Sequence, residues 1–329
     1  MTGVQVKRRG QSGSRAGAQA LTLLSTPINV AVLDALLEGP KPLVDLRRAA
    51  GSSPATTLRG HLKTLTGTEV IERRRQNSFP GSLDYALTPV GIELIAVTKA
   101  LQTWLDESPE GSLVVGGPSA KSAIKALIEG WGTGMVRALA AKPLSLTELD
   151  GLIAHLNYPS LERRLMAMRS AGQIEPAPSS GRGTPYTVTR WLRRAVAPLA
   201  LATRWERKHV PTRTTPMSRI DAEAAFLLAM PLVRPPAEVS GACRLAVDIQ
   251  SRNGGRPAGV LVGVQDGQIA SCTTIHGGPA DAWVSGSAPN WLEAVIGGET
   301  ERLEMGGDGD LARALIDGLH SALFTLQLR

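Results

Sequence analysis

The sequence is poor in cysteine, histidine and aromatic residues, and it has no long apolar run. Its 329 residues include 2 Cys and 5 His, and aromatic residues make up 4% of the chain. Cys243 and Cys272 form no CxxC pair, so we expect neither a disulfide framework nor a structural zinc site. No stretch approaches the ~18 apolar residues of a membrane span. The first residues lack the apolar core of a secretory signal, so we expect a cytoplasmic protein without a membrane partner.

Catalytic patterns are lacking as well. The Asp308-Gly309-Asp310 run has no other calcium-loop ligands, and the glycines before it lack the context of a phosphate-binding loop. The histidines show no metal-ligand spacing, and neither cysteine sits in a nucleophile motif. We therefore expect no enzyme activity, no metal and no cofactor.

The chain carries an excess of positive charge, which is unevenly distributed along the sequence. The formal net charge is +7, with about +3 in residues 1–110, +9 in residues 111–216 and −5 in residues 217–329. A basic body joined to an acidic terminal part favours a polyanionic partner for the body. A basic face kept only for solubility is the alternative.

Two loops rich in Gly, Pro and Ser, at residues 108–118 and 210–216, divide the chain. We expect a flexible basic tail at 1–19, one domain at 20–110, a second at 119–210 and a third at 217–329. Leu58 and Leu62 recur 103 residues later as Leu161 and Leu165. This indicates a tandem repeat.

Each copy predicts helix, turn, helix, and then two extended stretches joined by a polar turn. The expected helices are 28–37, 43–50 and 58–65 in the first copy, and 123–140, 146–156 and 160–168 in the second. The extended stretches are 70–75 and 83–88, and then 173–177 and 185–189. That order is a winged helix-turn-helix.

The runs LLEGP at 36–40, IERR at 71–74 and YALTPVG at 85–91 carry a family resemblance. They resemble the HxlR-type winged-helix transcription regulators, well over residues 20–108 and more loosely over 119–209. The second copy keeps Tyr186 and Thr189 but lacks the Pro-x-Gly that follows in the first. The resemblance implies binding to a double-stranded DNA operator. Family members often carry a cysteine near the start of the fold, sometimes for thiol sensing, and its absence here implies that the signal enters elsewhere.

The outward faces of the leucine-spaced helices and the wings supply the candidate DNA-binding residues. Arg and Lys can read guanine edges, whereas Ser and Thr more often fix phosphates. For each single residue, a solvated surface position is the alternative. The few aromatic residues form no basic-aromatic surface for single strands or RNA, so duplex DNA is favoured. The candidates are Ser52, Ser53, Thr56, Thr57, Arg59, His61, Lys63, Arg73, Arg74 and Arg75 in the first copy, and Asn157, Ser160, Arg163, Arg164, Arg169, Ser180 and Arg182 in the second.

The acidic third domain predicts strands followed by helices, an α+β unit with helices on one face of an antiparallel sheet. The runs VQDGQI at 264–269, DAWVSG at 281–286 and WLEAVIGG at 291–298 resemble the sterol-carrier-protein-like fold. That resemblance implies an apolar cavity for a hydrophobic small molecule. Val262, Ile269, Trp283 and Trp291 are the candidate lining residues, with a plain core role as the alternative for each.

The sequence therefore predicts an α+β chain with two tandem winged helix-turn-helix domains and a sterol-carrier-like domain. We expect a transcription regulator, with repression as the expected mode, that responds to a hydrophobic effector. A homodimer is one possible assembly, although tandem heads would let one chain act alone. The alternatives are a small-molecule carrier with vestigial winged helices and an architectural protein that binds DNA without sequence preference.

Overall fold

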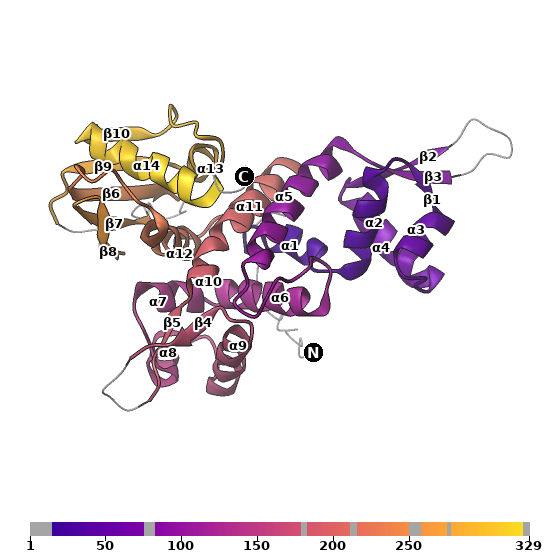
Figure 1. The fold of residues 1–329 in the computed structure, drawn as a ribbon, viewed down its shortest axis with the longest axis horizontal. Coiled ribbons are helices and arrows are strands. Elements are labelled where there is room, and N and C mark those ends of the chain that lie inside the picture. The colour runs from indigo at the N-terminus through magenta and orange to yellow at the C-terminus, as the bar shows by residue number, and fades with distance from the viewer. Residues whose placement is uncertain are drawn as a thin grey trace, which may run out of the picture.

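The computed structural model describes residues 15–75, 83–178, 183–210, 216–249, 258–274 and 278–324. The fold is α+β, with a winged helix-turn-helix at the N-terminal end and a five-stranded mixed sheet with helices at the C-terminal end (Figure 1). Below, residues 18–106 are called unit 1, residues 118–209 unit 2, and residues 219–324 unit 3.

Unit 1 is the winged helix-turn-helix. Its elements are α1 (Ala18–Leu24), α2 (Pro27–Leu37), β1 (Lys41–Pro42), α3 (Leu43–Ala49), α4 (Ala55–Gly67), β2 (Ile71–Arg75), β3 (Leu83–Leu87) and α5 (Pro89–Asp106). Helices α3 and α4 form the helix-turn-helix, and β3 lies between β1 and β2 in an antiparallel sheet whose β2–β3 pair is the wing. The turn that joins β2 to β3 lies outside the described residues.

Unit 2 has nearly the same order of elements. They are α6 (Pro118–Gly132), α7 (Met135–Ala141), α8 (Leu146–Leu152), α9 (Tyr158–Ser170), β4 (Ile174–Pro176), β5 (Tyr186–Val188), α10 (Arg190–Arg194) and α11 (Val196–His209). The single helix expected at 123–140 is wrong: the chain breaks between α6 and α7, where Gly134 takes a φ of +78° that most residues avoid. The counterpart of β1 is reduced to one bridge between Leu144 and Tyr186.

The two units also share hydrogen bonds at the base of the wing. Thr88 caps α5 by accepting from the Gly91 amide, and its hydroxyl donates to the Glu69 and Val70 carbonyls. Thr189 begins α10 in the same way, accepting from the Leu192 amide and donating to the Gly172 and Gln173 carbonyls. Because such caps satisfy otherwise unpaired backbone groups, each threonine fixes the helix that follows its pair of strands.

Unit 3 places helices on one face of its sheet. Its elements are α12 (Arg219–Ala229), the 3-10 helix η1 (Met230–Leu232), β6 (Gly241–Asp248), β7 (Ala258–Gln265), β8 (Gln268–Thr273), β9 (Ala282–Ser287), α13 (Ala288–Gly297), β10 (Glu304–Gly307) and α14 (Gly309–Phe324). Alternate side chains of β6 and β7, such as Leu245 and Val260, are buried beneath the helices. On the opposite face Trp283 is 43% exposed.

The expectation of an antiparallel sheet is wrong at one pair of strands. The strand order is β10-β9-β6-β7-β8, and β6 pairs with β9 in parallel. After β8 the chain returns to the far side of β6, so β9 runs in the direction of β6. Alternation of apolar residues predicts which face of a strand is buried, but it does not predict which strand lies beside it.

Units 1 and 2 meet through their long helices α5 and α11. Glu93 near the start of α5 contacts Lys208 near the end of α11, at 2.7 Å. Glu107, just after α5, contacts Arg194 at the end of α10, at 2.5 Å. The two helices therefore run antiparallel through the centre of the molecule (Figure 1).

Unit 3 is tied to unit 2 by a buried ionic cluster on α12. The Asp221 carboxylate is 3% exposed and accepts from the Trp131 indole at 2.9 Å. The Glu223 carboxylate accepts from Arg137 at 2.5 Å and from Arg219 at 2.6 Å. Because breaking one partner of a buried ion pair is costly, these contacts hold α12 firmly against α6 and α7.

Candidate nucleic-acid interface and apolar cavity

Helix α4 buries one face and exposes the other. Leu58, Leu62 and Leu65 are fully buried, as the spacing predicts. Thr56, Thr57, Arg59 and Lys63 are exposed on the helix. The second helix of a helix-turn-helix typically presents such a face to the major groove, so these four side chains are the candidates on α4 for contact with DNA.

His61 lies differently from the other candidates on α4. Its Nδ1 is 3.0 Å from the Asn29 side-chain oxygen, and the ring is half-buried. Asn29 on α2 is itself buried and donates to the Leu23 carbonyl. The geometry gives His61 a contact within unit 1, which the spacing along α4 alone did not indicate.

The turn before α4 carries the two candidate serines. Ser52 is exposed and has a left-handed φ of +57°, next to Gly51 at +67°. The Ser53 hydroxyl donates to the Ala50 carbonyl at 2.7 Å. In the turn between α3 and α4, Ser52 is thus exposed to solvent, whereas the Ser53 hydroxyl is hydrogen-bonded within the turn.

Helix α9 has the same length as α4, 13 residues, and buries Leu161, Leu165 and Met168. Arg163 is exposed, but Arg164 is half-buried and donates to the Ser160 carbonyl. Ser160 is half-buried as well, and its amide donates to the side chain of the capping residue Asn157. Arg163 and Arg169 are therefore the exposed arginine candidates on α9 itself.

The wings place further arginines in solvent. Arg73, Arg74 and Arg75 are exposed on β2, where Arg74 pairs with Glu72 and Arg73 lies over the Tyr85 ring. In unit 2, Arg169 lies over the Tyr186 ring and donates to its hydroxyl at 3.3 Å. The candidates Ser180 and Arg182 lie outside the described residues. Because side chains alternate along a strand, Arg73 and Arg75 share one face of β2, and Arg74 lies on the other face with Glu72.

Sequence comparison bears directly on this surface. Residues 23–111 match the HxlR-like helix-turn-helix family. Over 88 residues the chain is 30% identical to the HTH-type transcriptional regulator YodB of Bacillus subtilis, an alignment that covers 27% of this chain and 79% of that protein. The chain belongs to the HxlR-like helix-turn-helix family.

Two solved structures of YodB also match. The reduced form is 29% identical, covers 28% of this chain and 90% of its own, and has a TM-score of 0.27. The diamide-treated form is 29% identical, covers 27% and 88%, and has a TM-score of 0.26. The chain is an HxlR-family transcription regulator, distantly similar to YodB, and its helix-turn-helix implies DNA binding.

An apolar cavity of about 70 Å³ lies where unit 3 meets α11. Its walls come from α11, α12, α13, α14 and β6 and include Val196, Ala200, Phe226, Trp291 and Leu292. The Trp291 ring meets Phe226 edge-on at 5.0 Å, and its indole donates to the Ala246 carbonyl at 2.7 Å. All of the lining side chains are apolar, so the cavity suits a small hydrocarbon group.

Of the four predicted lining residues, the structure brings only Trp291 to this cavity. Val262 is fully buried on the helix-covered face of the sheet, and Ile269 is half-buried on the edge strand β8. Trp283 lies on the opposite face beside Arg244, in a separate groove. Strand alternation placed Trp283 and Val262 on opposite faces, so one cavity could not hold both.

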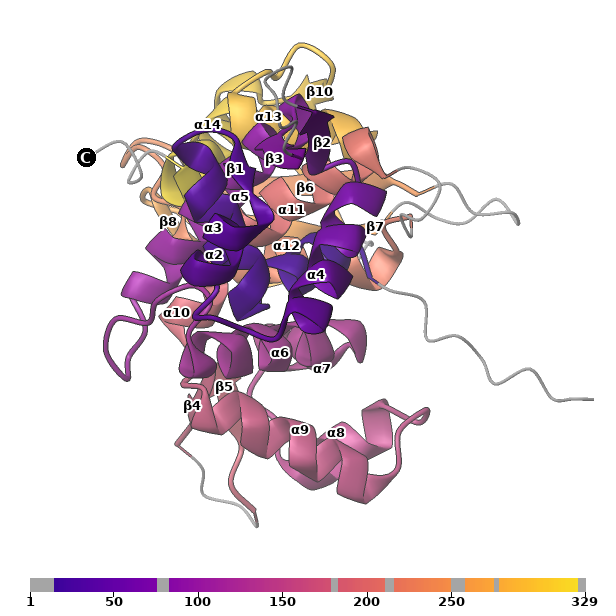
Figure 2. The same cartoon turned by 90° about the vertical axis from the view of Figure 1, so that its right-hand side faces the viewer.

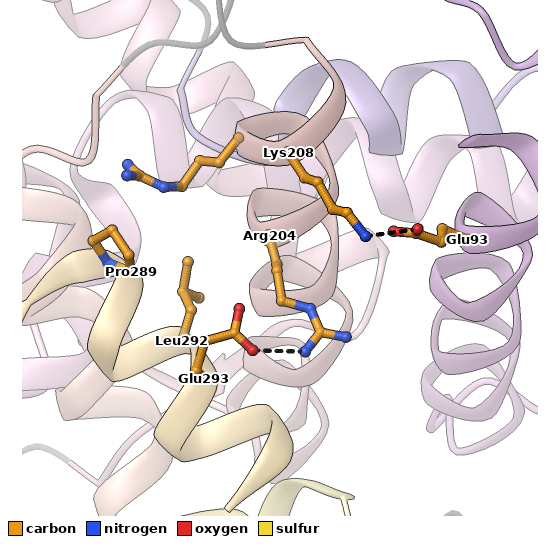
Figure 3. Close-up of a pocket in the computed structure, with 7 residues that line it drawn as sticks. Glu93, Arg204, Lys208, Pro289, Leu292 and Glu293 are labelled. Carbon is orange, nitrogen blue, oxygen red and sulfur yellow. Dashed lines mark hydrogen bonds and ion pairs between the residues drawn. The ribbon is translucent and has the colours of Figure 1, made fainter. Parts of the chain in front are cut away.

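A wider cleft of about 490 Å³ lies between α5, α11 and α13 (Figure 3). Arg204 reaches from α11 to Glu293 on α13 at 3.1 Å, and Lys208 reaches to Glu93 on α5. The pKa of Glu93 is lowered, chiefly by its hydrogen bonds with Lys208 and His209. These ion pairs join all three units, and no periodicity or motif in the sequence indicates them.

Both cysteines belong to unit 3, where Cys243 is buried on β6 and Cys272 is half-buried on the edge strand β8. Burial raises the pKa of both the Cys243 and the Cys272 thiol to about 12. Cys243 pairs with Val262 on β7, and Val262 pairs with Cys272 on β8. Two strand spacings of about 4.8 Å each separate the two cysteines. Their sum exceeds the Cα–Cα distance of ~7 Å that a disulfide can bridge. Within the described residues, no group of His, Cys, Asp and Glu is arranged to hold a metal ion.

No single helix among the described residues has the length and the apolar composition needed to cross a membrane. Helices α1 and α2 reach that length and composition only when they are taken together, and they are bent by 79° at their break.

Proposed function

We propose that this HxlR-family regulator binds a duplex operator through two heads, α4 with its wing and α9 with its wing. The observation that carries the proposal is the equivalence of the two helices. Both have 13 residues, both bury three side chains at the same spacing, and each turns an exposed arginine outward, Arg59 on α4 and Arg163 on α9. In this account unit 2 is a second winged helix-turn-helix, and the tail, the two heads and the terminal domain divide at 1–19, 20–110, 119–210 and 217–329.

The two heads are expected to read different half-sites. The residue 103 positions after Arg59 is Glu162, and the residue 103 positions after Lys63 is Met166. A guanidinium can donate two hydrogen bonds to guanine, whereas a carboxylate would meet cytosine and a thioether would meet a thymine methyl group. The operator should therefore be asymmetric.

The cavity beside α11 supports the effector part of the proposal. A hydrophobic small molecule in unit 3 would contact Val196 and Ala200, which belong to the last helix of unit 2. A ligand changes DNA affinity only if it prefers one arrangement of the heads, and a cavity built from both units can express that preference. The sterol-carrier-like character of unit 3 belongs to this proposal, as does repression as the mode of action.

The test is binding to DNA from upstream of the gene of this protein, measured by gel shift. If ~6–10 phosphates are neutralised, affinity should fall ~10³–10⁵-fold between 50 and 200 mM salt. Arg59→Ala and Arg163→Ala should each relax the base preference at one half-site, whereas Arg74→Ala should weaken all sequences alike. Glu110→Ala, an exposed change outside both heads, is the control.

Other outcomes would favour the other candidates. Salt-sensitive binding without sequence preference would indicate an architectural protein, and a tight ligand complex without operator binding would indicate a carrier. Native mass spectrometry of the purified chain would detect a retained ligand. Ala225→Leu, which adds carbon to the cavity wall, should abolish its retention and leave DNA affinity at the value of the ligand-free chain.

A further inference from the structure

The contacts between α5 and α11 follow a two-fold pattern within the single chain. The alignment that matches Thr88 to Thr189 matches each residue of α5 to the residue 101 positions later. Trp104 in α5 donates its indole hydrogen to the Trp191 carbonyl at 2.8 Å. Trp205, the counterpart of Trp104, donates to the carbonyl of Val90, the counterpart of Trp191, at 3.0 Å.

This exchange of roles is what a two-fold interface between identical subunits produces. In such an interface, if residue i contacts residue j of the partner, then j contacts i of the partner. The ion pairs obey the same rule. Glu93 contacts Lys208, and their counterparts Arg194 and Glu107 contact each other.

The charges at these equivalent positions are inverted between the units. Glu93 corresponds to Arg194, and Glu107 corresponds to Lys208. In unit 1 both positions are acidic, and in unit 2 both are basic. A unit 1 paired with another unit 1 by this geometry would place Glu93 beside Glu107 twice. A unit 2 paired with another unit 2 would place Arg194 beside Lys208 twice.

We propose that this inversion is a pairing code: it makes unit 1 pair with unit 2 and rejects a like unit from a second copy of the chain. Specificity of this kind comes from repulsion in the wrong pairing as well as attraction in the right one. The short connection at residues 107–117 then favours the unit 2 of the same chain, because it supplies a high effective concentration. Each chain thus closes with one head of each kind.

The proposal rests on the two heads of the proposed function and extends that function to assembly. A regulator that paired like with like would present two α4 heads or two α9 heads and would read symmetric sites. Pairing of unlike units gives every closed chain the same ordered pair of heads. Recognition of an asymmetric operator therefore requires that unlike units pair.

The test is refolding of the full chain from urea at high protein concentration, with the mass measured by native mass spectrometry. The double variant Glu107→Lys with Arg194→Glu keeps both contacts within a chain attractive. It also makes pairing of like units attractive, since Glu93 then faces a lysine at position 107 and Lys208 faces a glutamate at position 194. We expect the wild-type chain to refold as a monomer, and the double variant to refold as a mixture of monomers and higher assemblies.

A single variant tests whether the ion pair between Glu107 and Arg194 controls the pairing of the units or is an incidental contact. Glu107→Lys alone sets a second cation against Arg194, and the equilibrium that closes the two units should shift ~3- to 30-fold toward the open form. Near-UV circular dichroism of the stacked Trp104 and Trp191 rings, 4.4 Å apart, reports the closed form. Adding Arg194→Glu should restore the signal, and Glu110→Lys, the same charge change outside the interface, should leave it unchanged.

Two results would overturn the proposal. One is a double variant that refolds wholly as a monomer under conditions in which Glu107→Lys loses the stacked signal. The other is a set of single and double variants that all keep the wild-type signal and mass. No DNA is present in either measurement, so these results leave the DNA-binding proposal to its own test.

Discussion

Trp104 and Trp205 are the residues that connect units 1 and 2 most directly. Trp104 is 2% exposed, stacks on Trp191 with an interplanar angle of 3°, and both rings donate to backbone carbonyls across the junction. Indole combines a large apolar face with one donor, so a residue of this type can pack and fix register at the same time.

Removing the indole donor should therefore be costly. We expect Trp104→Phe to lower the free energy of unfolding by about 1–3 kcal/mol, because the buried Trp191 carbonyl loses its donor and the stacked contact shrinks. Trp205→Phe should act in the same direction through Val90. Urea unfolding measures both, and Trp283→Phe on the exposed sheet face is the control. Equal effects of all three variants would contradict the role given to the junction.

The cysteines are expected to be inert in the folded chain. With the pKa of each thiol raised to about 12 by burial, almost no thiolate is present at neutral pH. Iodoacetamide and diamide should leave the mass of the folded protein unchanged, whereas both cysteines should react in urea. Rapid alkylation of either cysteine without denaturant would contradict this expectation.

At the scale of elements, the stability that the packing of α5 on α11 provides should depend on pH through Glu93. Its pKa is lowered in the folded chain from the ordinary value of 4.5. Because the pKa is lower in the folded chain, the ionised Glu93 carboxylate stabilises the fold at pH values above its pKa in the unfolded chain. This stabilisation is lost as the pH falls through its pKa in the folded chain.

The Glu93→Gln variant isolates that contribution. At pH 7 we expect it to be about 0.3–1 kcal/mol less stable than the wild type, the usual range for exposed ion pairs. The difference should disappear in acid, once Glu93 of the wild type is protonated. Urea unfolding at pH 7 and at acidic pH measures this. A difference that persists in acid would assign the effect to packing instead of charge.

The sequence predicts where a helix lies more readily than it predicts which elements pack against it. The leucine spacing of 58–65 placed α4 and its buried face, because that spacing reflects burial within one element. The break at Gly134 and the parallel pairing of β9 with β6 depend on backbone conformation and on distant partners. The contact of His61 with Asn29 depends on how α2 meets α4.

The candidate sites follow the same division. The exposed arginines of α4 and the wing could be predicted, since exposure on a helix follows from periodicity. The ion pairs at Glu93 and Glu107 could not be seen in one unit alone. Alignment of the two units would have shown the inverted charges, but only the packing of α5 on α11 shows that those positions touch.

At the scale of the whole molecule, the helix pair α5 and α11 sets where α4 and α9, the two proposed heads, lie. Helices α4 and α9 lie in separate parts of the molecule in both views (Figures 1 and 2). Unit 3 packs on unit 2 through the buried Asp221 and Glu223. The net charge of residues 217–329 is −5, which opposes phosphate and so favours approach of DNA from the side of units 1 and 2.

The most direct measurement of the central claim is the stoichiometry and footprint of the chain on its operator. Native mass spectrometry should find one chain per duplex, and hydroxyl-radical footprinting should find two protected half-sites of different sequence, about one helical turn apart. Arg59→Ala should weaken protection of one half-site, and Arg163→Ala that of the other. Two chains bound to a symmetric site, or a single protected half-site that Arg163→Ala leaves unchanged, would contradict the account.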